Sequence, residues 1–251
     1  LRYEVESEWD VNLKERKILI VVGEHRPFKS DEAESFEAFC KGYDCAVYVN
    51  HISNYKSKYS FEGNLLASTV SRTEFKKELK PDIIISIGGQ TGDYPLYGLL
   101  SKMDLENVEC WRVASDGNVV DTYDKLTKIF ECSENYFFKK LAVSEENGHA
   151  YLKDILDHMQ YDRNIDIPFS NAYVARTLTQ IIPKDSNVQF SILNSLRVWN
   201  LFEFKNEVKC FSNVGAFGID GGMSTLIGQS MVSNNLCFMV IGDLAFLYDM
   251  N

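Results

Sequence analysis

Short runs of consecutive apolar residues recur along this chain, and segments with helical spacing separate them. Lys17–Gly23 (KILIVVG), Asp82–Gly88 (DIIISIG) and Leu236–Ile241 are nearly continuous apolar runs, as expected of strands buried on both faces of a sheet. The segment after the N-cap candidates Ser30-Asp31 instead places its apolar residues at helical spacing. Parallel strands need crossover connections, so this alternation predicts an α/β fold with parallel, doubly wound sheets.

We predict two Rossmann-like domains with parallel sheets, at residues 1–142 and 143–251. The second is expected to have strands near 187–193, 207–212 and 236–242. In the first, Lys128–Cys132 is expected at the sheet edge, while Arg2–Asn12 shows no periodicity. The turns GEHRP and GGQTG lack the GxGxxG fingerprint, so the first sheet is expected to be a scaffold without a nucleotide.

Composition excludes several classes of partner. The chain has 251 residues, 45% of them hydrophobic and 25% charged, and a formal net charge of −10. That charge disfavours nucleic acid and anionic membranes, and no apolar run reaches the roughly 18 residues that span a bilayer. We expect no signal peptide before Leu1, and the six cysteines form no CxxC motif. We therefore expect a cytoplasmic protein with free, buried thiols.

Both ends suggest an internal piece of a longer protein. Leu1 is not an initiator methionine, and the chain stops at Asn251, one turn into an expected helix.

Residues 211–251 carry the strongest functional signal. A strand, a glycine-punctuated turn with a helix and a second apolar strand lead to Gly242-Asp243. An acid after a buried strand, at the start of a helix, is placed to hold a cation beside a phosphate. The alternative is a purely structural role as the N-cap of that helix. The blocks SNVGAFGIDG and IGDLAFLYDMN, in this order, closely resemble the thiamine-diphosphate (ThDP) enzymes of menaquinone synthesis named 2-succinyl-5-enolpyruvyl-6-hydroxy-3-cyclohexene-1-carboxylate (SEPHCHC) synthases.

The resemblance covers the chain unevenly. It is specific over 190–251, moderate over 82–142, where PDIIISIGGQTGDYPLYGLL and WRVASDG echo the family's central domain, and only architectural over 1–81. It implies that 1–142 is that central, transhydrogenase dIII-like domain and that 143–251 is the truncated first half of the pyrophosphate-binding domain.

The resemblance also implies site residues. Asp243 would be a Mg²⁺ ligand, Ile219 would wedge under the cofactor, and the Phe217 carbonyl would face its pyrimidine amino group. No catalytic residue is expected in this chain, because the activating glutamate belongs to another domain. The implied cofactor-binding set is Asn194, Ser195, Phe217, Gly218, Ile219, Gly242, Asp243, Leu244 and Ala245.

The implied activity is decarboxylation of 2-oxoglutarate and addition of the product to isochorismate. The alternatives are a related ThDP-dependent decarboxylase or carboligase with another 2-oxo acid, and a non-catalytic α/β module. The implied full-length parent is a homodimer or homotetramer that binds ThDP and Mg²⁺, and this chain alone is expected to be inactive.

The chain departs from the family where the family binds substrate carboxylates. Val214 and Trp199 replace arginines, and Asp93 and Tyr94 replace a basic pair. A family GNS reads LNS here, so Asn194 and Ser195 match but the glycine does not. Lost arginines leave an anion unpaired, which favours a different substrate, and Arg197 on the same short helix is a candidate for partial compensation.

Overall fold

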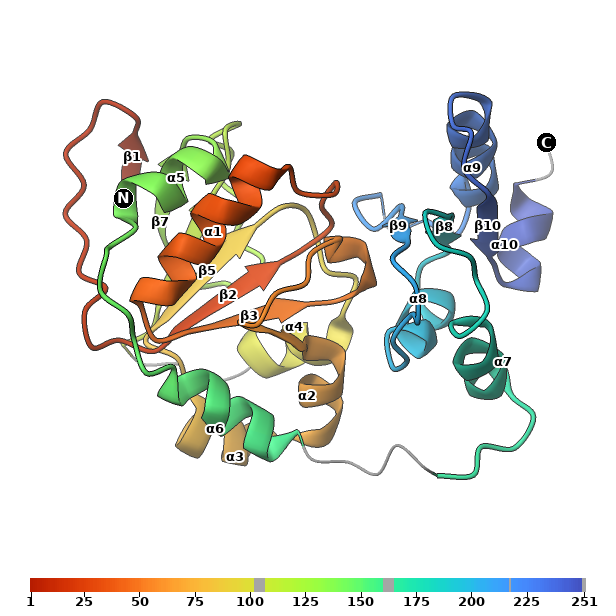
Figure 1. The fold of residues 1–251 in the computed structure, drawn as a ribbon, viewed down its shortest axis with the longest axis horizontal. Coiled ribbons are helices and arrows are strands. Elements are labelled where there is room, and N and C mark those ends of the chain that lie inside the picture. Colours follow the sequence, from red (N-terminus) through yellow and green to blue (C-terminus); the bar gives the residue numbers. More distant parts are fainter. Residues whose placement is uncertain (102–106, 160–164, 217, 250–251) are drawn as a thin grey trace.

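The computed structural model describes residues 1–101, 107–159, 165–216 and 218–249. Two α/β units lie side by side (Figure 1), each built on its own sheet. The prediction of an α/β fold with parallel sheets is confirmed, because every strand pair is parallel.

The first sheet has seven strands in the order β1-β7-β6-β5-β2-β3-β4. The apolar runs form its middle, where every residue of β2 and β3 is buried. The strands are β1 (Arg2–Glu4), β2 (Ile18–Val22), β3 (Cys45–Val49), β4 (Ser60–Glu62), β5 (Ile83–Ile87), β6 (Glu109–Val113) and β7 (Leu126–Glu131).

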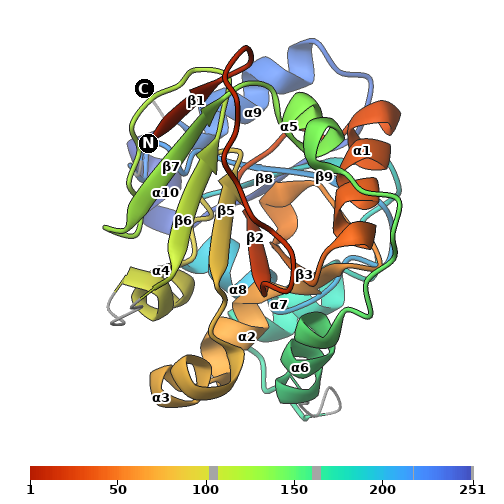
Figure 2. The same cartoon turned by 90° about the vertical axis from the view of Figure 1, so that its left-hand side faces the viewer.

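Helices cover both faces of this sheet (Figure 2). One face packs against α1 and α5, which contribute Phe36, Phe39, Phe137 and Phe138 to its core. The other face packs against four helical segments, α2 (Gly63–Thr69), η2 (Phe75–Leu79), α4 (Tyr94–Ser101) and α6 (Ala150–His158). The helical segments are α1 (Ser30–Gly42), η1 (His51–Ser53), α2 (Gly63–Thr69), α3 (Arg72–Glu74), η2 (Phe75–Leu79), α4 (Tyr94–Ser101), α5 (Glu134–Leu141) and α6 (Ala150–His158).

The structure corrects one edge of this sheet. Lys128–Cys132 was expected at the edge, but β7 pairs with both β6 and β1. Arg2–Glu4 joins as the outer strand through backbone pairing with residues 129–131, and three residues are too few to show a period. The domain division at 142/143 stays a prediction, and α6, which lies beyond it, packs against the first sheet through Tyr151 and Ile155.

The second sheet has three strands in the order β10-β8-β9, and it confirms the three predicted strands. Its middle strand is first in sequence. The chain passes from β8 to β9 on one side and then crosses back to β10 on the other side, which creates a switch point between β8 and β10. The elements of this unit are α7 (Asn171–Leu178), β8 (Asn187–Phe190), α8 (Asn194–Trp199), β9 (Lys209–Ser212), α9 (Gly222–Met231), β10 (Cys237–Val240) and α10 (Asp243–Tyr248).

Polar contacts from η1 and the residue after it join the two units. The Asn54 side chain donates to the Cys210 carbonyl at 2.8 Å and accepts from the Cys210 N–H at 2.8 Å, as a neighbouring strand would. His51 Nε2 lies 2.9 Å from the Trp199 carbonyl and 3.0 Å from that of Phe202. Ile52, fully buried, is part of the second unit's apolar core.

Candidate functional site

The carboxyl ends of β8 and β10 bring two of the predicted segments to one edge of the second sheet. These strands are parallel neighbours, with Phe190 paired to Val240. The turn that leads into Asn194 and Ser195 therefore lies at the same edge as Gly242 and Asp243. This edge is the switch point, where open parallel sheets bind ligands.

Leu193 in the first of these turns has a backbone that suits glycine. Its φ is 66° and its ψ is −128°, a region that a side chain with a Cβ disfavours. The resemblance implies a glycine of the family at this position, and the backbone at Leu193 is one that glycine adopts readily. Asn194 and Ser195 follow as the first residues of α8.

Asp243 begins α10 directly after Gly242, and its side chain is exposed. One carboxylate oxygen, Oδ1, accepts the N–H of Leu244 at 2.8 Å. Leu244 is exposed and Ala245 is buried in the same turn. In the part of the chain that the structure describes, no group of three or more His, Cys, Asp or Glu side chains is placed to hold a metal.

The glycine-rich turn leads from β9 into α9. Phe217 lies outside the described residues. Gly218 is half-buried, and the Ile219 side chain is 37% exposed. Gly222 packs closely against the sheet, because a Cβ there would meet Met239 at 3.0 Å and the Ser191 hydroxyl at 3.6 Å.

Asp249 completes this turn, and the sequence interpretation gave it no role. Its carboxylate accepts the N–H groups of Met223 at 2.6 Å and Ser224 at 3.0 Å, and the Ser224 hydroxyl at 2.7 Å. These hydrogen bonds lower the pKa of Asp249. The signal was the acid in FLYDMN, but its partners lie 25 and 26 positions away. The N-terminus of α9 is therefore occupied by the chain's own carboxylate.

Buried polar atoms without partners line the same edge. Ser191 follows β8 and Ser212 ends β9, and the hydroxyls of both are buried without a hydrogen-bond partner. Gln189 Oε1 is a third such atom, although its Nε2 donates to Asn213 at 3.1 Å. Buried polar groups in proteins nearly always have partners, so these atoms fit an edge that receives a polar ligand.

The positions where the family has substrate-binding basic residues have mostly become core. Val214 is 0% exposed and Trp199 is 5% exposed, both within the apolar core of the second unit. Asp93 is also buried and accepts the Tyr48 hydroxyl at 2.5 Å. Tyr94 is 49% exposed, and the Arg197 guanidinium lies 4.5 Å from the centre of its ring.

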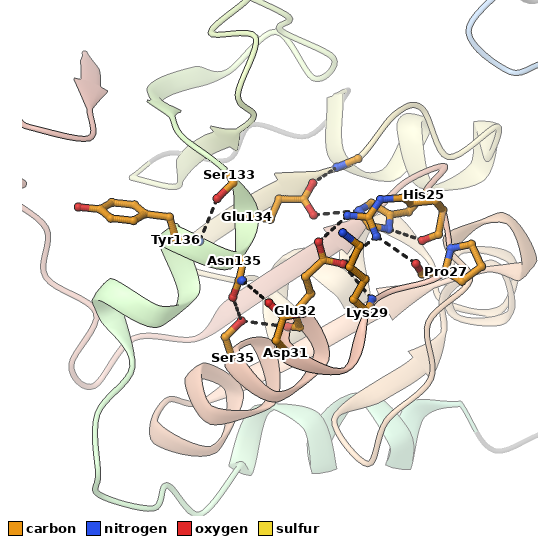
Figure 3. A network of polar contacts seen from close by, with 12 residues as sticks. His25, Pro27, Lys29, Asp31, Glu32, Ser35, Ser133, Glu134, Asn135 and Tyr136 are labelled. Carbon is orange, nitrogen blue, oxygen red and sulfur yellow. Dashed lines mark hydrogen bonds and ion pairs between the residues drawn. The ribbon is translucent and has the colours of Figure 1, made fainter.

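The first unit has a cavity of about 340 Å³ at the carboxyl ends of its own strands. Figure 3 shows the network beside it, where Glu134 accepts from His25 at 3.0 Å and from the Gly88 N–H at 3.0 Å. Burial alone would lower the pKa of His25, but Glu134 and the Arg26 carbonyl raise it. Arg26 pairs with Glu32, and on the far wall Arg112 pairs with Asp116. Since these charges are already paired, this cavity offers a weaker case for an anionic ligand than the edge of the second sheet.

Within the described residues, no helix is long and apolar enough to cross a membrane. No family model matches the chain. The chain is 28% identical to the SEPHCHC synthase of Phocaeicola vulgatus, over an alignment that covers 100% of this chain and 46% of that protein. It is 29% identical to the SEPHCHC synthase of Flavobacterium johnsoniae, covering 99% of this chain and 45% of that protein.

The chain is related to the SEPHCHC synthases. It spans a little under half the length of the curated relatives that it matches. Its fold is similar to that of a protein from Mycobacterium smegmatis described as a thiamin diphosphate-dependent enzyme, with a TM-score of 0.56 at 13% identity, covering 94% of this chain and 47% of that one. The relationship to these synthases and the Rossmann-like fold agree with the expectations from the sequence.

Proposed function

We propose that this chain is part of a ThDP-dependent enzyme that decarboxylates a 2-oxo acid and transfers the product to an acceptor, as SEPHCHC synthases do. The observation that carries the proposal is the relationship to SEPHCHC synthases along the whole chain. The edge of the second sheet supports it, because Asn194, Ser195 and Asp243 follow neighbouring parallel strands there, and the hydroxyls of Ser191 and Ser212 at this edge are buried without partners.

The residues present fit a diphosphate with its cation. Asp243 would supply one oxygen ligand to Mg²⁺, and Gly242, Leu244 and Ala245 would place backbone next to the diphosphate. Asn194 and Ser195 would hydrogen-bond its oxygens from the opposite turn. Gly218 and Ile219 would support the cofactor from the α9 side. When bound, ThDP supplies the electron sink for decarboxylation.

The second candidate is a related decarboxylase or carboligase that uses a different 2-oxo acid. The buried Val214, Trp199 and Asp93 favour it, because none of them offers a cation to a substrate. CO₂ release from a panel of 2-oxo acids, with and without isochorismate, separates the two candidates. We expect poor use of 2-oxoglutarate and isochorismate if nothing replaces the lost arginines, at a cost of about 1.5–3 kcal/mol per contact. Efficient SEPHCHC formation would show that other residues bind the carboxylates.

The cofactor assignment is tested by calorimetry. We expect the full-length gene product to bind ThDP in the presence of Mg²⁺, and Asp243→Ala to abolish this binding, because a hard cation loses an oxygen ligand. Asp157→Ala, at an exposed acid on α6, is the matched control and should bind normally. ThDP-dependent turnover by the Asp243→Ala variant would refute the role of Asp243. Residues 1–251 alone should show no measurable affinity.

We propose a cytoplasmic homodimer or homotetramer that acts on small molecules. Exposed apolar residues of the second unit support a contact with another domain or subunit. Met231, Val232, Leu244 and Leu247 are all at least 60% exposed. The oligomeric state is measured by light scattering on the full-length gene product.

A further inference from the structure

Gln189 is a buried polar residue in the middle strand of the second sheet. Its side chain is 1% exposed, and its neighbours in the strand, Val188 and Phe190, belong to the apolar core on the opposite face. Gln189 pairs in register with Met239, which packs against the start of α9, because a Cβ on Gly222 would meet it at 3.0 Å. Gln189 therefore lies on the face of the sheet that the start of α9 covers.

A series of hydrogen bonds, which we call the polar bridge, leads from Gln189 to the start of α9. Gln189 Nε2 donates to Asn213 Oδ1 at 3.1 Å, and Asn213 Nδ2 donates to Thr225 Oγ1 at 3.0 Å. The Thr225 hydroxyl in turn donates to the Gly221 carbonyl at 2.7 Å. The polar bridge thus connects β8, the residue after β9, and α9.

The Gly221 carbonyl fixes the direction of the polar bridge. A carbonyl oxygen only accepts, so the Thr225 hydroxyl uses its one proton there and can only accept from Asn213. The Asn213 amide then turns its oxygen toward Gln189, which must donate. This leaves Gln189 Oε1 buried without a partner among the described residues. An apolar residue would avoid the cost of that unsatisfied acceptor, so the retained amide points to a function beyond packing.

The polar bridge closes the glycine-rich turn. Asn213 directly follows β9 and Gly221 directly precedes α9, so the hydrogen bonds tie the two ends of the turn together. Gly221 has a φ of 80°, and a Cβ there would meet Asn213 Nδ2 at 3.5 Å. Between these ends lie Gly218 and Ile219, which the proposed function places against the cofactor. The position of both residues therefore depends on Gln189, in the middle of the sheet.

We propose that Gln189, Asn213 and Thr225 are positioning residues for the cofactor, and that the polar bridge holds the glycine-rich turn in the geometry that binds ThDP. This inference rests on the proposed function for the identity of the cofactor. A turn that is already ordered binds a ligand at a lower entropic cost than a turn that becomes ordered on binding. Loss of a hydrogen bond in the polar bridge should therefore weaken ThDP binding more than it slows the chemical step.

The first test removes one end of the polar bridge in the full-length gene product. Thr225→Val replaces the hydroxyl with a methyl group of similar size. We expect its Kd for ThDP, measured by calorimetry in the presence of Mg²⁺, to rise about tenfold, with kcat at saturating ThDP within about twofold of the wild type. Thr225→Ser keeps the hydroxyl and should restore the affinity. An unchanged Kd in Thr225→Val would overturn the proposal.

Thr177→Val is the matched control. Thr177 is exposed, as Thr225 is, and its hydroxyl also donates to the carbonyl four residues earlier, that of Tyr173, at 2.8 Å. Thr177 lies on α7, outside the polar bridge, so Thr177→Val should leave the Kd for ThDP unchanged. An equal loss of affinity in both variants would show that any such helical hydroxyl has this effect, and would overturn the role of the polar bridge.

A variant at the other end tests whether the polar bridge acts as a unit. Gln189→Met keeps the length of the side chain but removes the donor to Asn213. Alone it should also raise the Kd for ThDP about tenfold. Combined with Thr225→Val, the rise should remain about tenfold, whereas independent effects would multiply to about 100-fold. A 100-fold rise in the double variant would refute the coupling of Gln189 to Thr225.

Hydrogen exchange separates this inference from the proposed function. The Thr225 N–H donates to the Gly221 carbonyl at 2.9 Å, where the polar bridge ends. Without cofactor, Gln189→Met should make exchange at the start of α9 about five- to tenfold faster, and Thr177→Val should leave it unchanged. Faster exchange in a protein that does not bind ThDP would refute the proposed function and support the polar bridge. Exchange in Gln189→Met equal to that of the wild type would refute the polar bridge, whether or not ThDP binds.

Discussion

Leu193 has a backbone conformation that suits glycine, the residue that the resemblance implies at this position. A φ of 66° with a ψ of −128° is open to glycine and strained for leucine. The sequence showed the substitution of the glycine, but it did not show whether the turn had changed with it. The structure shows that Leu193 adopts a glycine-like backbone, and that α8 begins directly after it with Asn194 and Ser195.

We expect Leu193→Gly to be more stable than Leu193→Ala, by about 1–2 kcal/mol, because both lose the leucine side chain but only glycine relieves the strain. At an ordinary φ the order is reversed, since glycine costs about 0.5–1 kcal/mol relative to alanine. Urea denaturation of both variants, followed by circular dichroism, gives the two free energies of unfolding. An alanine variant as stable as the glycine variant would show that the position is unstrained.

At the scale of elements, the sequence predicted the buried strands well and the local connections less well. The runs around β2, β5 and β10 are apolar over several residues, and this pattern is visible in a single sequence. By contrast, β1 and β4 have only three residues each, and α2 begins with the poor helix formers Gly63 and Asn64. The local residue propensities therefore did not predict these elements. Short edge strands form through pairing with a strand that is already folded, and pairing is not encoded in a local pattern.

The candidate site also combines features that the local sequence predicts with features that depend on distant segments. The sequence predicted that Asp243 and Ser195 lie at helix starts after buried strands, and the strand order brings these two helix starts to one edge of the sheet. Asp249 and Arg197 were harder, because their environments depend on segments far away in sequence. Asp249 accepts from the start of α9, and Arg197 stacks on a ring of the first unit.

Asp249 joins the end of α10 to the start of α9, and its removal should loosen α9. In Asp249→Ala, the N–H groups of Met223 and Ser224 lose their acceptor, so their hydrogen exchange should become faster. Amides in β3, in the buried first sheet, should be unaffected. Asp220→Ala removes an exposed acid of the same turn and is the control. Unchanged exchange at Met223 and Ser224 would show that water replaces the carboxylate at no cost.

At the scale of the whole molecule, the two units share a polar and apolar contact centred on η1. Ile52 lies in the core of the second unit, and Asn54 pairs with the backbone of β9. This contact places the loop before α4 against α8, since a Cβ on Gly92 would meet Leu196 at 2.8 Å and Val214 at 2.9 Å. The stacking of Arg197 on Tyr94 depends on this arrangement, because the two residues come from different units.

His51 makes this contact sensitive to acid. Burial lowers the pKa of His51 to about 4, against the raising effect of the carbonyls of Trp199 and Phe202. An unfolded histidine has a pKa of about 6.5, so between pH 6.5 and 4 the unfolded chain binds a proton that the folded protein excludes. The contribution of His51 to the free energy of unfolding is therefore fully present above about pH 6.5. It should decrease as the pH falls toward 4, by at most about 3 kcal/mol.

We expect His51→Gln, which cannot titrate, to lose less stability than the wild type between pH 7.5 and pH 4.5. His25 titrates in both proteins and its pKa is raised, so its contribution has the opposite sign and cancels in the comparison. Urea denaturation at each pH, with tryptophan fluorescence, to which the buried Trp199 contributes, as the probe, measures the difference. If both proteins lose the same stability over this range, then His51 is already solvated when the units are in contact. The coupling of the two units would then depend on Ile52 and Asn54 rather than on the imidazole.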